Sequence, residues 1–118
     1  DLFTPPRSLA WVTDLGYVPE HVKENIRKVH TLVIEANYEE ELLERDERRP
    51  WSTKQRIRGR HGHLSNNAAF DLVEELSQNS LLEKVYIAHL SRDCNNASLV
   101  RDKFASLGRS LSIEVIDP

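Results

Sequence analysis

Three short runs of apolar residues constrain the fold of this chain more than any other feature of its sequence. Residues 8–15, 31–37 and 84–91 are almost continuously apolar, with little alternation between apolar and polar residues. Such runs are typical of strands buried on both faces of a sheet, whereas a strand with one wet face alternates. We therefore expect three buried strands, and a fourth strand over residues 112–116 that alternates less cleanly.

Helical signals fill the stretches between these strands. Pro19 favours the first turn of a helix that continues to Val29. The polar residues that favour N-cap positions of later helices are Ser52 or Thr53, Ser65 or Asn66, and Asn95 or Asn96. The expected helices cover about residues 19–29, 38–46, 52–59, 66–79 and 96–108. The resulting order β, α, β, α, α, α, β, α, β belongs to the α/β class.

The totals place limits on the class of protein. A chain of 118 residues is expected to form a single domain over residues 1–118, with a flexible, proline-broken start at residues 1–7. No apolar run approaches the roughly 20 residues of a spanning helix, so we expect no membrane partner and a cytoplasmic location. Cys94 is the only cysteine, which excludes an internal disulfide and a cysteine-rich zinc site. The chain begins at Asp1 and contains no methionine, which is typical of an excised piece, a processed product or an incomplete sequence.

Polar residues follow each of the three apolar runs. Asp14 ends the first run, Glu35 and Asn37 end the second, and His89 ends the third. Ligands of open α/β sheets bind outside the carboxyl ends of the strands, so these side chains are predicted to share one polar pocket. The simpler interpretations are a turn or helix-capping role for Asp14 and Glu35, and a surface position for His89.

The segment from Arg60 to Asn67 brings a His-x-His pair to the start of the strongest helical pattern. His61 and His63 can bind a metal, or one of them can act as a general acid or as a donor to phosphate. Gly62 allows close backbone approach, and the helix that follows offers free amides to an anion. The alternative is a loop with incidental histidines.

The charges are strongly segregated beside this loop. Residues 38–47 are rich in acid, whereas residues 48–60 contain six arginines and lysines and no acid. The basic run leads into the histidine loop, where a polyanion would dock, although a solvated surface is the simpler interpretation. Trp51, Arg56 and Arg58 can stack on or clamp nucleic acid, while Trp51 can instead anchor a loop to the core.

Four motifs of the chain, in order and spacing, resemble a known family. They are Thr13-Asp14-Leu15-Gly16, residues 32–38, Gly62-His63-Leu64-Ser65-Asn66 and Ala88-His89-Leu90-Ser91. The sequence from Leu9 to Asp117 resembles the C-terminal half of metallo-β-lactamase-fold hydrolases, most closely the exonuclease-like phosphodiesterases related to ribonuclease Z. The resemblance implies half of an αββα sandwich: a roughly four-stranded mixed sheet with helices mainly on one face.

The resemblance also implies roles for individual residues. Asp14 matches the aspartate that bridges two metals, and His89 matches the last histidine ligand. His63 resembles the histidine that contacts or protonates the scissile phosphate, with Glu35 beside it. The implied cofactors are two divalent ions, zinc or manganese, which hold an attacking hydroxide. The residues expected to contact substrate are His61, Ser65, Asn66, Arg56 and Arg58.

The chain departs from the family pattern in one respect. The His-x-His-x-Asp-His signature of the N-terminal half does not occur in these residues. We therefore expect a C-terminal half-domain that is inactive alone, and that either meets its missing N-terminal half or self-associates through an exposed sheet face.

Two classes of function follow from these patterns. The first is a metal-dependent phosphodiesterase or nuclease that is complete only with its missing half, and hydrolysis of a small phosphoester or thioester is a variant of it. The alternative is a metal-free nucleic-acid-binding or assembly module that uses the basic segment 48–60.

Overall fold

The computed structural model describes residues 8–78, 81–108 and 111–116. Within these ranges the expected order of strands and helices is confirmed, and the prediction of a flexible start at residues 1–7 lies outside them. None of the helices in these ranges has the length and apolarity that a membrane-spanning helix requires. The elements are β1 (Leu9–Val12), α1 (Glu20–Ile26), β2 (Thr31–Glu35), α2 (Glu40–Arg45), α3 (Trp51–Arg58), α4 (Asn66–Ser77), β3 (Lys84–Ala88), α5 (Ala97–Phe104), a short 3-10 turn (Ala105–Leu107) and β4 (Ser112–Val115).

The strands form one sheet in the order β1-β2-β3-β4, and every neighbouring pair is parallel. The prediction of a mixed sheet was therefore wrong. At least one helix connects each strand to the next, and such a crossover returns the chain to the starting edge, so the next strand runs in the same direction.

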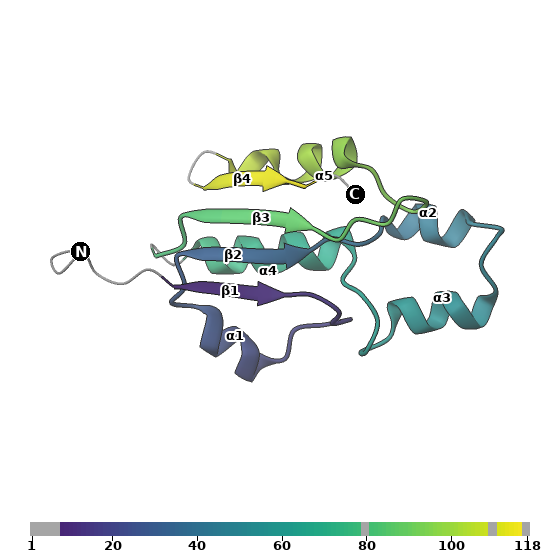
Figure 1. Ribbon diagram of the computed structural model, residues 1–118, viewed down its shortest axis with the longest axis horizontal. Helices are drawn as coiled ribbons and strands as arrows, with labels where there is room; N and C mark the ends of the chain where they lie inside the picture. The colour runs from purple at the N-terminus through teal and green to yellow at the C-terminus, as the bar shows by residue number, and fades with distance from the viewer. Residues whose placement is uncertain (1–7, 79–80, 109–110, 117–118) are drawn as a thin grey trace, which may run out of the picture.

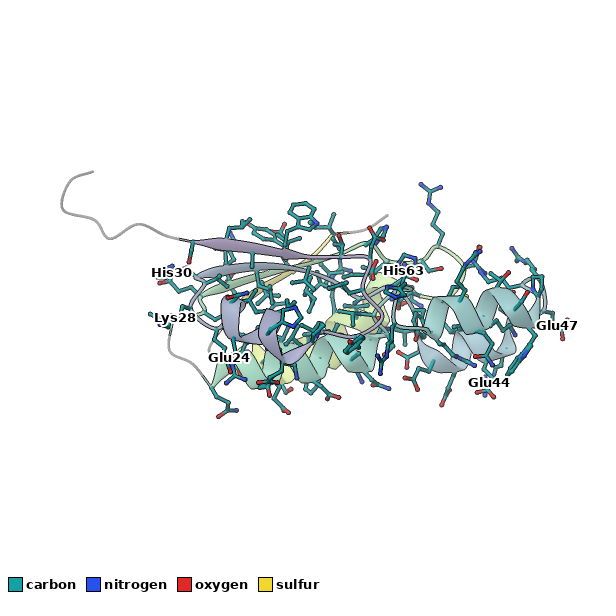
Figure 2. All side chains as sticks on the ribbon, turned by 90° about the horizontal axis from the view of Figure 1, so that it is seen from below. Glu24, Lys28, His30, Glu44, Glu47 and His63 are labelled. Atoms are coloured by element: carbon teal, nitrogen blue, oxygen red, sulfur yellow. The ribbon has the colours of Figure 1, made fainter. Side chains whose placement is uncertain are left out.

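The helices divide into two groups around this sheet. Right-handed crossovers taken in sequential order place their helices on the same face of a sheet. Figures 1 and 2 show α1, α4 and α5 together on one face, as expected, whereas α2 and α3 lie beyond the carboxyl ends of the strands.

The helix-covered face holds the main core. One row of paired strand residues on this face consists of Val12, Ile34, Ile87 and Val115, and the first three of them are buried. Burial of such side chains is the principal stabilising contribution to the domain. The helices add Ala69, Leu72, Val73 and Leu76 of α4 and Val100 and Phe104 of α5.

The opposite face of the sheet is not covered by any helix in the described ranges. Its middle row pairs Trp11 with Val33, Tyr86 and Glu114. Leu9 is 60% exposed and Trp11 is 67% exposed, so the prediction that the first strand is buried on both faces was wrong. An apolar run shows that a strand can be buried on both faces, but only one face of this sheet is covered by helices in the described ranges. We call Leu9, Trp11, Val33 and Tyr86 the open face.

Helix caps fix where the loops meet the helices. Ser65 caps α4 and Asn96 caps α5, each accepting a hydrogen bond from a backbone N–H, at 3.1 and 2.9 Å, as one of the two predicted alternatives in each case. The predicted cap of α3 at Ser52 or Thr53 was wrong, because that helix begins directly after Pro50, which has no side-chain cap. Proline has a fixed φ that suits entry into a helix.

Candidate metal centre

The polar residues that follow the strands converge at the carboxyl edge of the sheet. Asp14, Glu35, His63 and His89 each offer a nitrogen or oxygen atom, and these atoms lie within 4.8 Å of one another. Asp14 and His89 follow β1 and β3, Glu35 is the last residue of β2, and His63 lies in the loop before α4. The expected common pocket is thus present as a four-residue cluster, which we call the His/Asp/Glu cluster.

Two members of this cluster have an unusual backbone conformation. Asp14 has a φ of 60° and His89 a φ of 62°, and in the described part of the chain no other non-glycine residue has a positive φ. This left-handed region costs most residues about 1–3 kcal/mol, and residues held in it gather at functional sites. The surrounding structure therefore holds both strand ends in conformations that they would not adopt freely.

Glu35 is the centre of the cluster. Its side chain is fully buried, and its Oε1 accepts from Nδ1 of His63 at 2.8 Å and contacts Nδ1 of His89. Its Oε2 accepts a hydrogen bond from the backbone N–H of Leu64 at 3.0 Å. A buried carboxylate is tolerated when its oxygens are paired in this way. Glu35 therefore fixes both imidazole rings relative to the sheet.

Asp14 faces the same imidazoles from the solvent side. Its Oδ1 lies 3.6 Å from Nδ1 of His63 and 3.8 Å from Nδ1 of His89, and its side chain is 69% exposed. Imidazole nitrogens and carboxylate oxygens are the donor set that zinc and manganese accept. The cluster fits one divalent ion, and it has too few donors to enclose two.

Asn37 ties the neighbouring loops to β2. Its side-chain amide donates to the carbonyl of His89 at 2.8 Å, and its backbone N–H donates to the carbonyl of Leu64 at 2.9 Å. The carbonyl of Asn37 accepts from the backbone N–H of Ser91 at 2.7 Å. The residue therefore holds in place both the histidine that follows β3 and the segment that carries His63.

Gly16 brings the two loops of the cluster into direct backbone contact, and Gly62 packs its own loop against the end of α3. The backbone N–H of Gly16 donates to the carbonyl of Arg60 at 2.9 Å, and a Cβ at Gly16 would lie 1.6 Å from the carbonyl oxygen of Gly59. A Cβ at Gly62 would lie 2.2 Å from the carbonyl oxygen of Ile57. No side chain fits at either position without a shift of the backbone, so the loop of Asp14 and the loop of His63 are packed as one unit.

The residues predicted to contact substrate are not all brought to the cluster. Asn66 is fully buried, and its side chain exchanges amide hydrogen bonds of 2.8 and 2.9 Å with Asn95. Ser65 is 5% exposed, and its hydroxyl caps α4. His61 is exposed and does not belong to the cluster. Sequence analysis missed the role of Asn95, because a pair formed across 29 residues leaves no local signal.

Arg56 and Arg58 point in different directions. Arg56 is exposed, whereas Arg58 is half-buried. Arg58 lines a pocket of about 470 Å³ beside the cluster, together with Tyr38 and Ser65. Burial raises the pKa of Tyr38 above its ordinary value, Glu40 raises it further, and Arg58 opposes them. The Tyr38 phenol therefore stays neutral and can donate a hydrogen bond at neutral pH.

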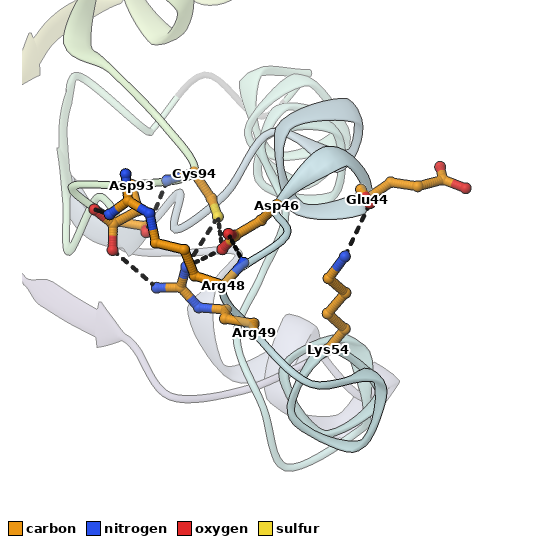
Figure 3. Close-up of polar contacts among 8 residues, drawn as sticks. Glu44, Asp46, Arg48, Arg49, Lys54, Asp93 and Cys94 are labelled. Atoms are coloured by element: carbon orange, nitrogen blue, oxygen red, sulfur yellow. Dashed lines mark hydrogen bonds and ion pairs between the residues drawn. The ribbon is translucent and has the colours of Figure 1, made fainter.

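A second polar cluster anchors α2 and α3 to the loop that follows His89 (Figure 3). Asp46 pairs with Arg49, and Nη2 of Arg49 lies 3.3 Å from Oδ2 of Asp93. The thiol of Cys94 lies 3.6 Å from the Asp46 carboxylate, and burial raises its pKa. A hydrogen bond from the backbone N–H of Arg48 and another from Arg49 hold the pKa of Asp46 below its ordinary value. Sequence analysis missed this cluster, which we call the Asp46–Arg49 anchor.

The fold and the His/Asp/Glu cluster together define an α/β domain with a candidate metal centre at one edge of a parallel sheet. No protein-family model matches the chain. Over 121 residues the chain is 35% identical to exodeoxyribonuclease YycJ of Bacillus anthracis, covering 95% of this chain and 45% of that protein. Over 118 residues it is 31% identical to exodeoxyribonuclease WalJ of Streptococcus pneumoniae strain D39, covering 94% of this chain and 43% of that protein. The chain thus spans less than half the length of these relatives.

Proposed function

We propose that this chain is part of a metal-dependent exodeoxyribonuclease of the metallo-β-lactamase superfamily. The convergence of Asp14, Glu35, His63 and His89 at the carboxyl edge of the sheet carries the proposal. The similarity to proteins named exodeoxyribonuclease supports the reaction and its DNA substrate. A carboxylate and imidazoles that meet in a partly exposed cluster fit hydrolysis assisted by a divalent ion better than a purely structural role.

The residues of the cluster have different proposed roles, which follow from their positions. Asp14 and His89 are the proposed metal ligands, and a bound zinc or manganese ion would supply positive charge and an acidified water. Glu35 contacts Nδ1 of both rings and so orients them relative to Asp14. When its ring carries both protons, His63 can donate a hydrogen bond or a proton from Nε2 to a phosphate oxygen.

The remaining ligands come from outside the described residues in this proposal. Four donor residues cannot complete the two-metal site of such hydrolases. The open face, with Leu9 and Trp11 more than half exposed, has the composition of a surface that packs on another sheet. We propose that the rest of a longer protein covers it, and that the chain alone is inactive and self-associates through the same face.

Metal binding tests the roles of the cluster directly. Equilibrium dialysis against Zn²⁺ or Mn²⁺, followed by elemental analysis, should find bound metal on the wild-type chain. Asp14→Asn and His89→Gln should lose it. Glu35→Gln should weaken binding by about 10–100-fold, as expected for a residue that orients ligands. His61→Gln is the matched control, because His61 lies two residues from His63 but outside the cluster. Equal metal retention in all variants would contradict the proposal.

Activity provides the second test. In a longer chain that supplies the missing ligands, Asp14→Asn should lower exonuclease activity on DNA by at least about 100-fold, with His61→Gln as the control. Exonuclease activity that is unaffected by both Asp14→Asn and chelation would contradict the proposal. Nucleic-acid binding without any such activity would instead favour the alternative function. That alternative, a metal-free nucleic-acid-binding or assembly module, is supported by the exposed position of Arg56 in the basic segment 48–60. The identity of the metal and the cytoplasmic location stay predictions.

A further inference from the structure

The helix α3 has two different faces. Its inward face carries Ile57, which packs against the small apolar cluster of Tyr38, Leu43 and Cys94. Lys54 also points inward, because its Nζ donates to the carbonyl of Glu44 in α2 at 2.9 Å. The exposed side chains form the opposite side, which we call the outward face of α3. The outward face consists of Trp51, Ser52, Gln55 and Arg56.

Trp51 is the most unexpected residue of the outward face. Its side chain is 68% exposed, so the interpretation of Trp51 as an anchor to the core is wrong. No apolar neighbour of the outward face shields it, since Ser52, Gln55 and Arg56 are all polar. An exposed indole among polar and cationic side chains is the combination that stacks on bases of single strands.

The charge around the outward face suits a polyanion. Residues 48–60 contain no acid. Two acids of the neighbouring helix, Glu40 and Glu44, line a pocket together with Arg58, which lies outside the outward face. Arg48, which precedes α3, has an 82% exposed side chain and lies 3.7 Å from Asp93 at its closest. Arg56 on the outward face and Arg48 just before α3 can therefore meet phosphates, and α3 itself contains no acid.

The outward face leads to the His/Asp/Glu cluster. The helix α3 ends at Arg58, and an eight-residue helix is about 10–12 Å long. Beyond its end, the guanidinium of Arg60 lies 5.2 Å from the centre of the Tyr17 ring. The hydrogen bond from Gly16 to Arg60 holds this pair next to the loop of Asp14. Figure 1 shows α3 running from the far end of the molecule back towards the loop at the end of β1.

We propose that the outward face of α3 and the Tyr17–Arg60 pair form a binding track for single-stranded DNA. Trp51 stacks on an unpaired base, and Arg56 and Arg60 contact the phosphates of the strand that runs towards the cluster. A paired duplex hides the faces of its bases, so the track selects single strands. The link of this track to a reaction rests on the proposed nuclease function, whereas binding itself requires only the residues of the track.

Binding without metal isolates the track from the chemistry. Fluorescence anisotropy of a labelled 12-nucleotide DNA strand, in excess chelator, should show Trp51→Ala weakening binding by about 5-fold or more. Arg56→Gln should weaken it as well, and a duplex of the same sequence should bind with little dependence on Trp51. Trp11→Ala is the matched control, because Trp11 is 67% exposed but lies on the open face. Equal effects of the two tryptophan substitutions, or no binding by the wild type, would overturn the proposal.

Tryptophan fluorescence provides a direct readout of stacking. The chain has two tryptophans, so Trp11→Phe leaves Trp51 as the only reporter. Single-stranded DNA should quench its emission, whereas Trp51→Phe should leave Trp11 unquenched. If the binding track is wrong, Asp14→Asn should still lose metal. If the nuclease proposal is wrong, DNA strands should still bind in chelator. The two proposals can therefore fail separately.

Discussion

The two tryptophans of the chain are almost equally exposed, at 67% for Trp11 and 68% for Trp51, yet they lie in different surroundings. Trp11 belongs to a row with Val33 and Tyr86 on one face of the sheet, so its neighbours on this face are apolar or aromatic. Trp51 lies on a helix among polar and cationic side chains. The difference teaches that exposure alone does not identify a surface. Apolar neighbours indicate a face that packs on protein, whereas isolated aromatic rings among cations indicate contact with a charged ligand.

The largest expected difference between the two tryptophans concerns self-association. If the open face packs on a second copy of the chain, Trp11→Asp should weaken self-association by about 30-fold, as for a tryptophan at the centre of an interface. Trp51→Asp should leave it unchanged. Sedimentation equilibrium over a range of protein concentrations measures both. A monomeric wild type at the highest concentrations would show that the open face does not pack on its own copy.

Salt should affect the two surfaces differently, and the expected change is smaller than the effect of Trp11→Asp. Each phosphate contact to a single strand contributes a slope of about −0.7 in log Kobs against log salt. Two arginine contacts should therefore weaken strand binding about sevenfold between about 50 and 200 mM salt, and Arg56→Gln should reduce the slope by about 0.7. Self-association through the open face should change little, because burial of apolar surface is not screened. Equal salt dependence of strand binding and of self-association would show that the two surfaces do not differ in this way.

Acid should weaken the support of α3, and this is the smallest of the expected effects. The hydrogen bonds from Arg48 and Arg49 hold the pKa of Asp46 below its ordinary value of 3.8. This carboxylate thus stabilises the fold above pH 3.8, and the contribution is lost as the pH falls through the lowered pKa. The melting temperature of Asp46→Asn should lie slightly below that of the wild type at neutral pH and meet it in strong acid. Trp11→Ala should show no such convergence, and an equal pH dependence would contradict the role of Asp46.

Sequence reasoning could predict much of this arrangement for physical reasons. The order of elements followed from short apolar runs and helical spacing. Asp14, Glu35 and His89 were expected together because ligands of open α/β sheets bind outside the carboxyl ends of the strands. The parallel sheet was missed, although helical connections between strands imply it. Burial of β1 on both faces was wrong, because an apolar run cannot tell which partner covers it.

The supporting residues were harder to predict. Asp46 and Cys94 meet across 48 residues, and Asn66 and Asn95 meet across 29, and neither pair has a periodic or local signal. The exposure of Trp51 was also open, because the same residue can anchor a loop or face solvent. Such contacts depend on how helices dock, which single residues in the sequence do not specify.

The glycine contacts between the loops have one further consequence. Because the backbone of Gly16 packs directly against that of Gly59 and Arg60, the loops that carry Asp14 and His63 are held together without an ion. Loading such a site requires little rearrangement, so the affinity is not reduced by the work of assembling it. In the proposed metal site, this fixed spacing of the loops would also limit which sizes of ion fit. Selectivity in this domain would then be a property of its main chain, and exchange of ligand side chains alone would change it only in part.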